Sequence, residues 1–316
     1  MTPDIRLAPL AGITDWPFRL LCFEQGCDCA TTEMVSALGY SYSPSARSVT
    51  CLLERHPGEP KLILQLFGKE PEYMAKAAAG LSETGRFDGI DINMGCPAHK
   101  VAAGGEGCGL MRDLERAEAI IRATVRASAV PVSVKMRLGW DDAHRNAVEL
   151  AKICETNGVA EIAVHGRTRM QMYSGKADWD AIAEVKRAVS IPVLGNGDIA
   201  DAGDCLEKIA RSGVDGVLIG RGALGNPWLF RQIRQRMAGE EPSPVPRKQR
   251  IGTILRHYGM MLDWKPEHIA VAEMRKHIGW YISGTRGAAA LRDRVNHMDD
   301  PVQVMELLRG LEDESE

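Results

Sequence analysis

Eight short apolar runs, most of them separated by amphipathic stretches, limit most strongly how this chain can fold. Apolar runs of this length bounded by turn residues are typical of buried strands. The runs are Ile5–Leu10, Cys29–Met34, Lys61–Phe67, Phe87–Asn93, Val130–Leu138, Val159–Gly166, Ile191–Gly197 and Val214–Gly220. Strands that alternate with helices favour a parallel sheet, and eight such units predict an α/β fold, a (β/α)8 TIM barrel. A doubly wound open sheet is the alternative, because periodicity does not separate the two.

Two of the intervening helices carry start signals. Asp113 is expected to cap a helix whose apolar stripe is Leu114, Ala117, Ile121 and Val125. Asp141 is expected to cap the next helix, whose stripe is Ala147, Leu150, Ala151 and Cys154.

The pattern changes at residues 238–246, where Pro242, Pro244 and Pro246 exclude a continuous helix. Beyond this point no strand pattern recurs, and the helical stretches are 251–263, 266–283, 288–296 and 302–311. We therefore predict a catalytic barrel domain over residues 1–237, a linker over 238–246, and a small C-terminal helical bundle domain over 247–316.

Composition excludes several classes of protein. The 316 residues are 45% hydrophobic and 26% charged with a net charge of −3, as in an ordinary globular protein. The first residues lack the basic start of a signal peptide, and no apolar run is long enough to span a membrane. The eight cysteines form no C-x-x-C pair and are expected to be reduced thiols. We expect a cytoplasmic monomer with no membrane anchor and no metal site.

A candidate reactive centre follows the fourth predicted strand. The turn containing Gly95 and Pro97 places the thiol of Cys96 just past the strand end, three residues after the amide of Asn93. A lone cysteine in a loop is more often a small buried residue. The other strand ends change that balance, because Gln65, Lys135, His165 and Asn196 also stand at carboxyl ends, where barrel enzymes carry their chemistry.

The last two strands end in glycine turns, Asn196-Gly197-Asp198 and Gly220-Arg221-Gly222, with Gly225 three residues further on. The spacing from Gly220 to Gly225 matches a dinucleotide fingerprint, but that fingerprint belongs to a first βαβ unit and not to a last strand. In barrels the last two loops often bind phosphate, so we favour a phosphate site with Arg221 adding charge. The alternative is tight packing at the glycines.

These residues together fit a flat, phosphorylated cofactor such as flavin mononucleotide (FMN). Lys135 would lie near the N1–C2 edge of the ring and stabilise the reduced anion, and Gln65 would hydrogen bond the ring edge. Taken singly, Lys135 and His165 are more often structural.

Several stretches resemble the bacterial tRNA-dihydrouridine synthases, and the B-type subfamily most of all. They are Ala8–Asp15, Asn93–Pro97, His165–Arg169, Asn196–Ile199, and Met274–His277 with Trp280-Tyr281, so the resemblance covers nearly the whole chain. It implies an FMN-containing barrel, a helical tRNA-binding domain, and NADPH-dependent reduction of uridines in tRNA. It assigns the proton donor to Cys96, places His165 by the flavin, and assigns flavin contacts to Pro9, Leu10, Ala11, Gln65, Lys135, Asn196, Gly197, Asp198, Gly220 and Arg221. Cys108 departs from the family pattern, and we expect it to be a packing residue.

The predicted helical domain is basic, which agrees with a tRNA partner. Residues 246–297 contain ten Lys or Arg and four Asp or Glu. Arg275 and Lys276 are the substrate-binding candidates there, and Lys276 shares a helix face with Trp280. Asn93 is a weaker candidate for holding the base. Two alternatives stay open at this point: an FMN-dependent barrel oxidoreductase acting on a free pyrimidine or another small molecule, and an RNA-binding barrel without catalysis.

Overall fold

Eight parallel strands close into a barrel in the computed structural model, which describes residues 2–311. The order around the barrel is β2-β1-β9-β8-β7-β6-β5-β4, and pairing of β2 with β4 closes it. The strands are β1 Asp4–Leu7, β2 Cys29–Thr31, β4 Leu62–Phe67, β5 Gly89–Met94, β6 Val132–Arg137, β7 Glu161–His165, β8 Val193–Asn196 and β9 Gly216–Ile219. Each lies within one of the eight predicted runs or overlaps it, so the TIM barrel is confirmed and the open sheet is wrong. A further two-residue strand, β3 Val35–Ser36, pairs with the carboxyl half of β4.

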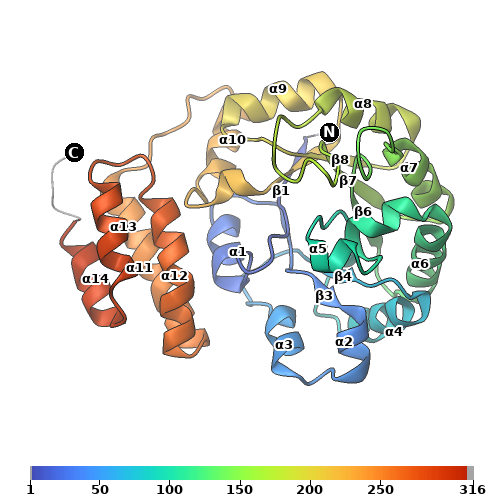
Figure 1. Cartoon of the computed structure of the whole chain (residues 1–316). Helices are drawn as coiled ribbons and strands as arrows, with labels where there is room; N and C mark the ends of the chain where they lie inside the picture. The colour runs from blue at the N-terminus through green and yellow to red at the C-terminus, as the bar shows by residue number, and fades with distance from the viewer. Residues whose placement is uncertain (1, 312–316) are drawn as a thin grey trace.

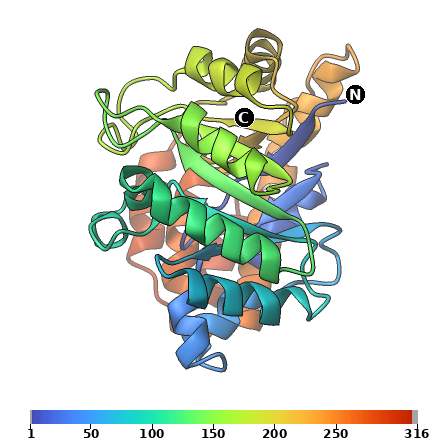
Figure 2. The same ribbon diagram turned by 90° about the vertical axis from the view of Figure 1, so that its right-hand side faces the viewer.

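The helices that surround the barrel cover its strands (Figures 1 and 2). They are α1 Trp16–Phe23, α2 Ala37–Tyr42, α3 Arg47–Thr50, α4 Pro71–Ser82, α5 His99–Ala102, α6 Leu114–Ala127, α7 Ala147–Thr156, α8 Trp179–Ala188, α9 Ala202–Ser212 and α10 Leu229–Met237, with short 3-10 turns η1 Cys51–Leu53, η2 Gly107–Arg112 and η3 Arg221–Ala223. Most buried apolar side chains of the strands and helices form one large core, and Ala8, Ala163, Leu194 and Leu218 form a small separate cluster. None of the helices within residues 2–311 combines the length and apolarity that crossing a membrane requires.

The two predicted helix caps had different outcomes. The Asp113 side chain accepts a hydrogen bond from the Arg116 N–H at the start of α6, as predicted. The Asp141 prediction is wrong, because its carboxylate accepts from the N–H groups of Ala143 and His144 in a separate turn. Helix α7 begins only after Asn146, and its predicted apolar stripe is buried.

Four helices follow the barrel and stand beside α1 (Figure 1): α11 Arg247–Trp264, α12 Glu267–Tyr281, α13 Ala288–Asn296 and α14 Pro301–Arg309. They enclose a second apolar cluster, which also takes in Trp228 from the segment before α10. Close packing joins the two parts at Gly225, where a Cβ atom would lie 2.3 Å from the Trp280 carbonyl carbon. The proposed division into domains stays a prediction, and residues 312–316 of the last domain lie outside the described part.

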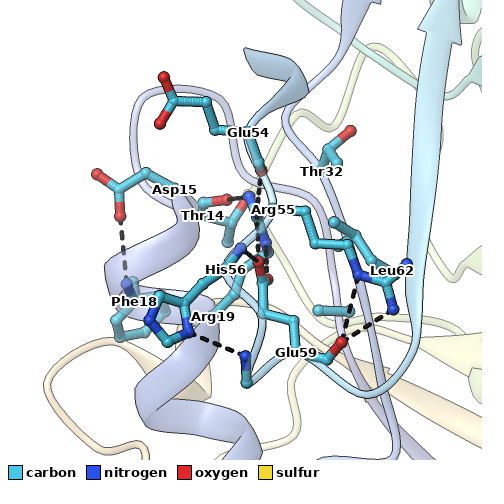
Figure 3. A network of polar contacts seen from close by, with 12 residues as sticks. Thr14, Asp15, Phe18, Arg19, Thr32, Glu54, Arg55, His56, Glu59 and Leu62 are labelled. Carbon is cyan, nitrogen blue, oxygen red and sulfur yellow. Dashed lines mark hydrogen bonds and ion pairs between the residues drawn. The ribbon is translucent and has the colours of Figure 1, made fainter. Parts of the chain in front are cut away.

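A buried polar network anchors the start of α1 and the loop before β4 (Figure 3). Arg19 donates from Nε to Glu59 Oε1 over 2.6 Å, from Nη1 to the Thr14 carbonyl over 2.9 Å, and from Nη2 to the Glu54 carbonyl over 2.8 Å. Glu59 also accepts from the His56 N–H over 2.7 Å. Thr14 in turn closes a tight turn by accepting from the Leu10 N–H. This network fixes the segment that leads from β1 to the mouth of the barrel.

Candidate active site

A cavity of about 370 Å³ opens at the carboxyl ends of the strands, within the size range of cofactor pockets. The structure brings Cys96, Lys135 and both glycine turns to this one cavity. Its lining includes every predicted cofactor residue and both residues of the predicted reactive centre: Pro9, Leu10, Ala11, Gln65, Asn93, Cys96, Lys135, His165, Asn196, Gly197, Asp198, Gly220 and Arg221.

The side chain of Asn93 shapes the turn that carries the thiol. Its Oδ1 accepts from the Gly95 N–H over 3.1 Å and from the Cys96 N–H over 2.9 Å. Its Nδ2 donates to Gln65 Oε1 over 2.8 Å. The backbone of Cys96 is therefore held from β5, while its side chain is partly exposed at the cavity.

A buried carboxylate stands behind this turn. Asp91 accepts from Gln65 Nε2 over 2.8 Å and from Ser133 Oγ over 2.7 Å. A chain of hydrogen bonds thus runs from Ser133 through Asp91, Gln65 and Asn93 to the backbone of Cys96. Burial raises the pKa of Asp91 to about 6, although the hydrogen bonds from Gln65 and Ser133 oppose that rise.

We expect Asp91→Asn to stabilise the protein in a pH-dependent way. The folded protein holds the Asp91 proton more tightly than an ordinary carboxyl with a pKa of 3.8. Ionisation therefore lowers the free energy of unfolding as pH rises from about 4 through about 6. Asparagine copies the protonated carboxyl, and the Ser133 hydroxyl can rotate to accept its new N–H. The variant should gain up to about 3 kcal/mol at neutral pH and little near pH 4. Denaturant unfolding at both pH values measures this, and an equal difference at both would contradict it.

Lys135 and His165 both line the cavity, and both are buried basic groups. Lys135 Nζ donates to Asn196 Oδ1 over 3.1 Å, and Asn196 Nδ2 donates to the Leu218 carbonyl over 2.8 Å. Burial lowers the pKa of Lys135 to about 8, and the nearby Arg137 contributes. Burial, followed by the charges of Lys135 and Arg137, lowers the pKa of His165 well below its usual range, so its ring is neutral.

Two arginines that the sequence did not single out brace the mouth of the cavity. Arg137 Nε donates to the Gly95 carbonyl over 2.9 Å, and its Nη1 donates to the carbonyls of Thr168 and Met172, both over 2.8 Å. Arg167 Nη2 pairs with Asp198 over 2.7 Å. Arg137 is the last residue of β6, and Arg167 lies two residues after β7 within the His165–Arg169 stretch that resembles the family.

Asp198 adopts a left-handed backbone conformation with φ of 51°. Partial burial raises its pKa, but the Ala177 N–H and Arg167 outweigh that effect and lower it. Asp198 is therefore an ionised carboxylate that ties the β8 loop to the loop after β7.

The three glycines at positions 220, 222 and 225 serve two purposes: two allow close packing, and one lines the cavity. A Cβ at Gly222 would lie 2.1 Å from the Ile199 carbonyl oxygen, and Gly225 packs on α12, so these two glycines are required by close packing. At Gly220 the nearest atoms to a Cβ are 3.8 Å away, and Gly220 and Arg221 line the cavity.

The two predicted substrate residues of the helical part lie outside this cavity. Lys276 Nζ donates to the Gly12 carbonyl at its rim. Arg275 instead pairs with Asp299 over 2.6 Å. Cys108 is fully buried, and burial raises its pKa to about 12. Tyr173, Met172 and Met34 line the cavity without having been predicted.

A closed parallel barrel with polar groups converging at the carboxyl ends of its strands defines a TIM-barrel enzyme. The chain belongs to the dihydrouridine synthase (Dus) family, whose model matches residues 6–315. The predicted family is therefore confirmed, and with it the prediction that the chain is an oxidoreductase.

Curated relatives extend over nearly the whole chain. A probable tRNA-dihydrouridine synthase of Rickettsia conorii is 43% identical over 97% of this chain and 92% of its own length. The tRNA-dihydrouridine synthase B of Pseudomonas putida is 41% identical over 94% of this chain and 88% of its own length. Among solved structures, histamine dehydrogenase from Rhizobium sp. 4-9 superposes with a TM-score of 0.55 at 14% identity. That superposition covers 82% of this chain and 49% of the other, and it shows the fold alone.

Proposed function

We propose that the chain is a tRNA-dihydrouridine synthase that uses FMN and NADPH to reduce the C5–C6 double bond of specific uridines in tRNA. The observation that carries this proposal is the meeting of Cys96, Lys135 and the two glycine turns in one cavity. The family and the names of the relatives support the same activity.

The cavity residues fit a phosphorylated flavin. The lowered pKa of Lys135 indicates that no carboxylate of the described chain compensates it fully, so an anionic ligand would be favoured there. Asn196, Gly197, Gly220, Arg221 and the backbone of Asp198 would hold the phosphate end, because the Asp198 carboxylate is itself ionised and paired with Arg167. Gln65, Lys135 and His165 would hold the ring, with Pro9, Leu10 and Ala11 as the wall. When bound and reduced, FMN supplies the hydride that adds to C6 of the uracil.

The chain's own contribution to the reaction is a positioned acid. The thiol of Cys96, which is partly exposed at the cavity, would donate its proton to C5 of the uracil. Asn93 holds the Cys96 backbone in place, and this use of its amide favours a positioning role over direct contact with the base. The uridine must leave its stack to reach the cavity, which costs a few kcal/mol.

The helical part would contribute to binding tRNA, through Lys276 at the mouth and Arg275 beside it. Of its basic residues, Arg256 pairs with Glu24, and Lys265 with Asp15 and Glu273, which reduces the free charge. All eight cysteines are free thiols, which agrees with a cytoplasmic protein. We also propose a monomer without a metal.

Incubation of the purified protein with NADPH and an unmodified tRNA transcript tests the proposal. We expect dihydrouridine in the recovered tRNA, quantified by mass spectrometry of its nucleosides. Reduction of free uracil or uridine in place of tRNA would instead establish the small-molecule alternative.

A further inference from the structure

Two arginine side chains stack on the indole ring of Trp140 at the edge of the barrel mouth. Trp140 stands in the loop after β6, Arg112 at the end of η2, and Arg169 in the loop after β7. Each guanidinium lies over the Trp140 ring, with its carbon 4.8 Å from the ring centroid. Stacking on an aromatic ring restricts the orientation of a guanidinium, whose planar group of donors suits bidentate contact with an anion.

Within residues 2–311 neither Arg112 nor Arg169 forms an ion pair. Arg169 Nη1 donates to the Met170 Sδ over 3.3 Å, and its Nε is buried with no hydrogen-bond acceptor. Arg145, in the same loop as Trp140, differs because it pairs with Asp142 over 2.8 Å and with Asp178 over 2.9 Å. Two guanidinium groups on one ring, with no carboxylate partner in the described part of the chain, favour an anion such as phosphate.

Two exposed side chains follow Arg169 along the same loop. Met170 is 57% exposed and Tyr173 48% exposed. Tyr173 also lines the cavity, so the surface continues into the candidate active site. The loops are held together, because the Arg169 N–H donates to the Gly139 carbonyl over 2.9 Å and the Met170 N–H donates to the Trp140 carbonyl over 3.0 Å. Thioether and phenol groups held in this way can contact unstacked bases.

This surface and the helical part lie on opposite sides of the barrel mouth. In the strand order, β6 and β7 lie across the barrel from β1 and β2. The helices α11–α14 stand on the opposite side, next to α1 (Figure 1). An RNA strand that is bound by the helical part and crosses the cavity would therefore reach this surface next.

We propose that Arg112, Trp140, Arg169, Met170 and Tyr173 form an RNA-docking surface, called here the arginine rim. Arg112 and Arg169 bind phosphates of the strand that flanks the target uridine, and Met170 and Tyr173 contact a neighbouring unpaired base. This inference rests on the proposed function and names a second RNA contact beyond the helical part. Phosphate-bearing RNA is favoured over a protein partner because the rim combines uncompensated cations with continuity to the cavity.

The double variant Arg112→Gln/Arg169→Gln tests the rim, with tRNA binding measured over a range of salt concentrations. Each lost phosphate contact lowers the slope of log Kd against log salt by about 0.7 to 0.9. We therefore expect a slope smaller by about 1.4 to 1.8 and a Kd raised at least about 10-fold near physiological salt. Arg112→Lys/Arg169→Lys keeps the charges and should retain most of the slope.

The matched control is Arg145→Gln/Arg211→Gln, which removes the same charge from two ion-paired exposed arginines. It should bind tRNA with the wild-type slope. Flavin content and melting temperature check that each variant folds. A wild-type slope and Kd in the rim variant would overturn the rim, while continued dihydrouridine formation would leave the proposed function intact. If the wild type neither binds nor reduces tRNA, both proposals fail.

Discussion

Cys96→Ala is expected to lose uridine reduction by roughly 100- to 10,000-fold, the usual contribution of a positioned general acid. The thiol is the proton donor in the proposed reaction, and no other described cysteine lines the cavity. The hydrogen bond from the Cys96 N–H to Asn93 belongs to the backbone, so alanine keeps the turn. The variant should therefore retain bound flavin and its reduction by NADPH, followed by flavin absorbance, while dihydrouridine is measured in tRNA.

Cys108→Ala is the matched control for this experiment. Its thiol is close in sequence to the turn but fully buried, and it makes only long contacts, to the Gly139 carbonyl over 3.8 Å and to the Met111 sulfur over 3.9 Å, within the described residues. Removing it should lower stability modestly and leave uridine reduction close to wild type. Full turnover by Cys96→Ala would reject the assigned role of Cys96.

The barrel was predictable because each strand is a separate local signal. An apolar run that ends in a turn indicates a buried strand even when its neighbours in the sheet are unknown. Eight such strands alternating with helices are compatible with only a few folds. β3 was missed because a strand of two residues is too short to show the alternation of apolar and polar residues that marks a strand. Asp141 was misassigned because a capping residue serves a turn as well as a helix, and only the course of the backbone separates the two.

The cavity was predictable in part for the same reason. Gln65, Asn93 and Lys135 stand at strand ends, and the barrel rule brings such ends together. Asp91 was missed, although it lies two residues before Asn93 and so shares its face of the strand. Its role depends on register, since Asp91 pairs with Gln65 on one side and Ser133 on the other. Register between strands that are far apart in sequence is set by the closed barrel, which no local pattern contains.

The sequence did not predict that the residues of the arginine rim, or Arg19 and Glu59, would meet, although Arg169 lies in the His165–Arg169 stretch that resembles the family. Arg112, Trp140 and Arg169 come from three separate loops, and Arg19 and Glu59 are 40 residues apart. Charged residues in loops and helices are normally exposed, so composition alone assigns these arginines to the surface. Their significance comes from burial and from missing or present partners, which only the folded chain defines.

Arg19→Ala is expected to lower the free energy of unfolding by about 3–5 kcal/mol. The side chains of Arg19 and Glu59 are 3% and 0% exposed, so the variant leaves a buried carboxylate without its counter-charge (Figure 3). It also removes the donors to the carbonyls of Thr14 and Glu54. Because Thr14 closes the turn at Leu10, we expect weaker flavin binding along with the loss of stability.

Denaturant unfolding measures the loss of stability, and flavin retention measures the weaker flavin binding. An exposed ion pair serves as the comparison for the loss of stability. Arg211→Ala breaks an exposed ion pair with Asp180, whose side chains are 56% and 68% exposed, and should cost no more than about 1 kcal/mol. Arg19→Met/Glu59→Leu removes both buried charges, so it should be more stable than Arg19→Ala. Recovery should stay incomplete, because the Thr14 and Glu54 carbonyls and the His56 N–H still lack partners. If Arg19→Ala costs no more than Arg211→Ala, the buried pair does not hold the β1 loop, and the cavity wall at Leu10 must be fixed by its own turn alone.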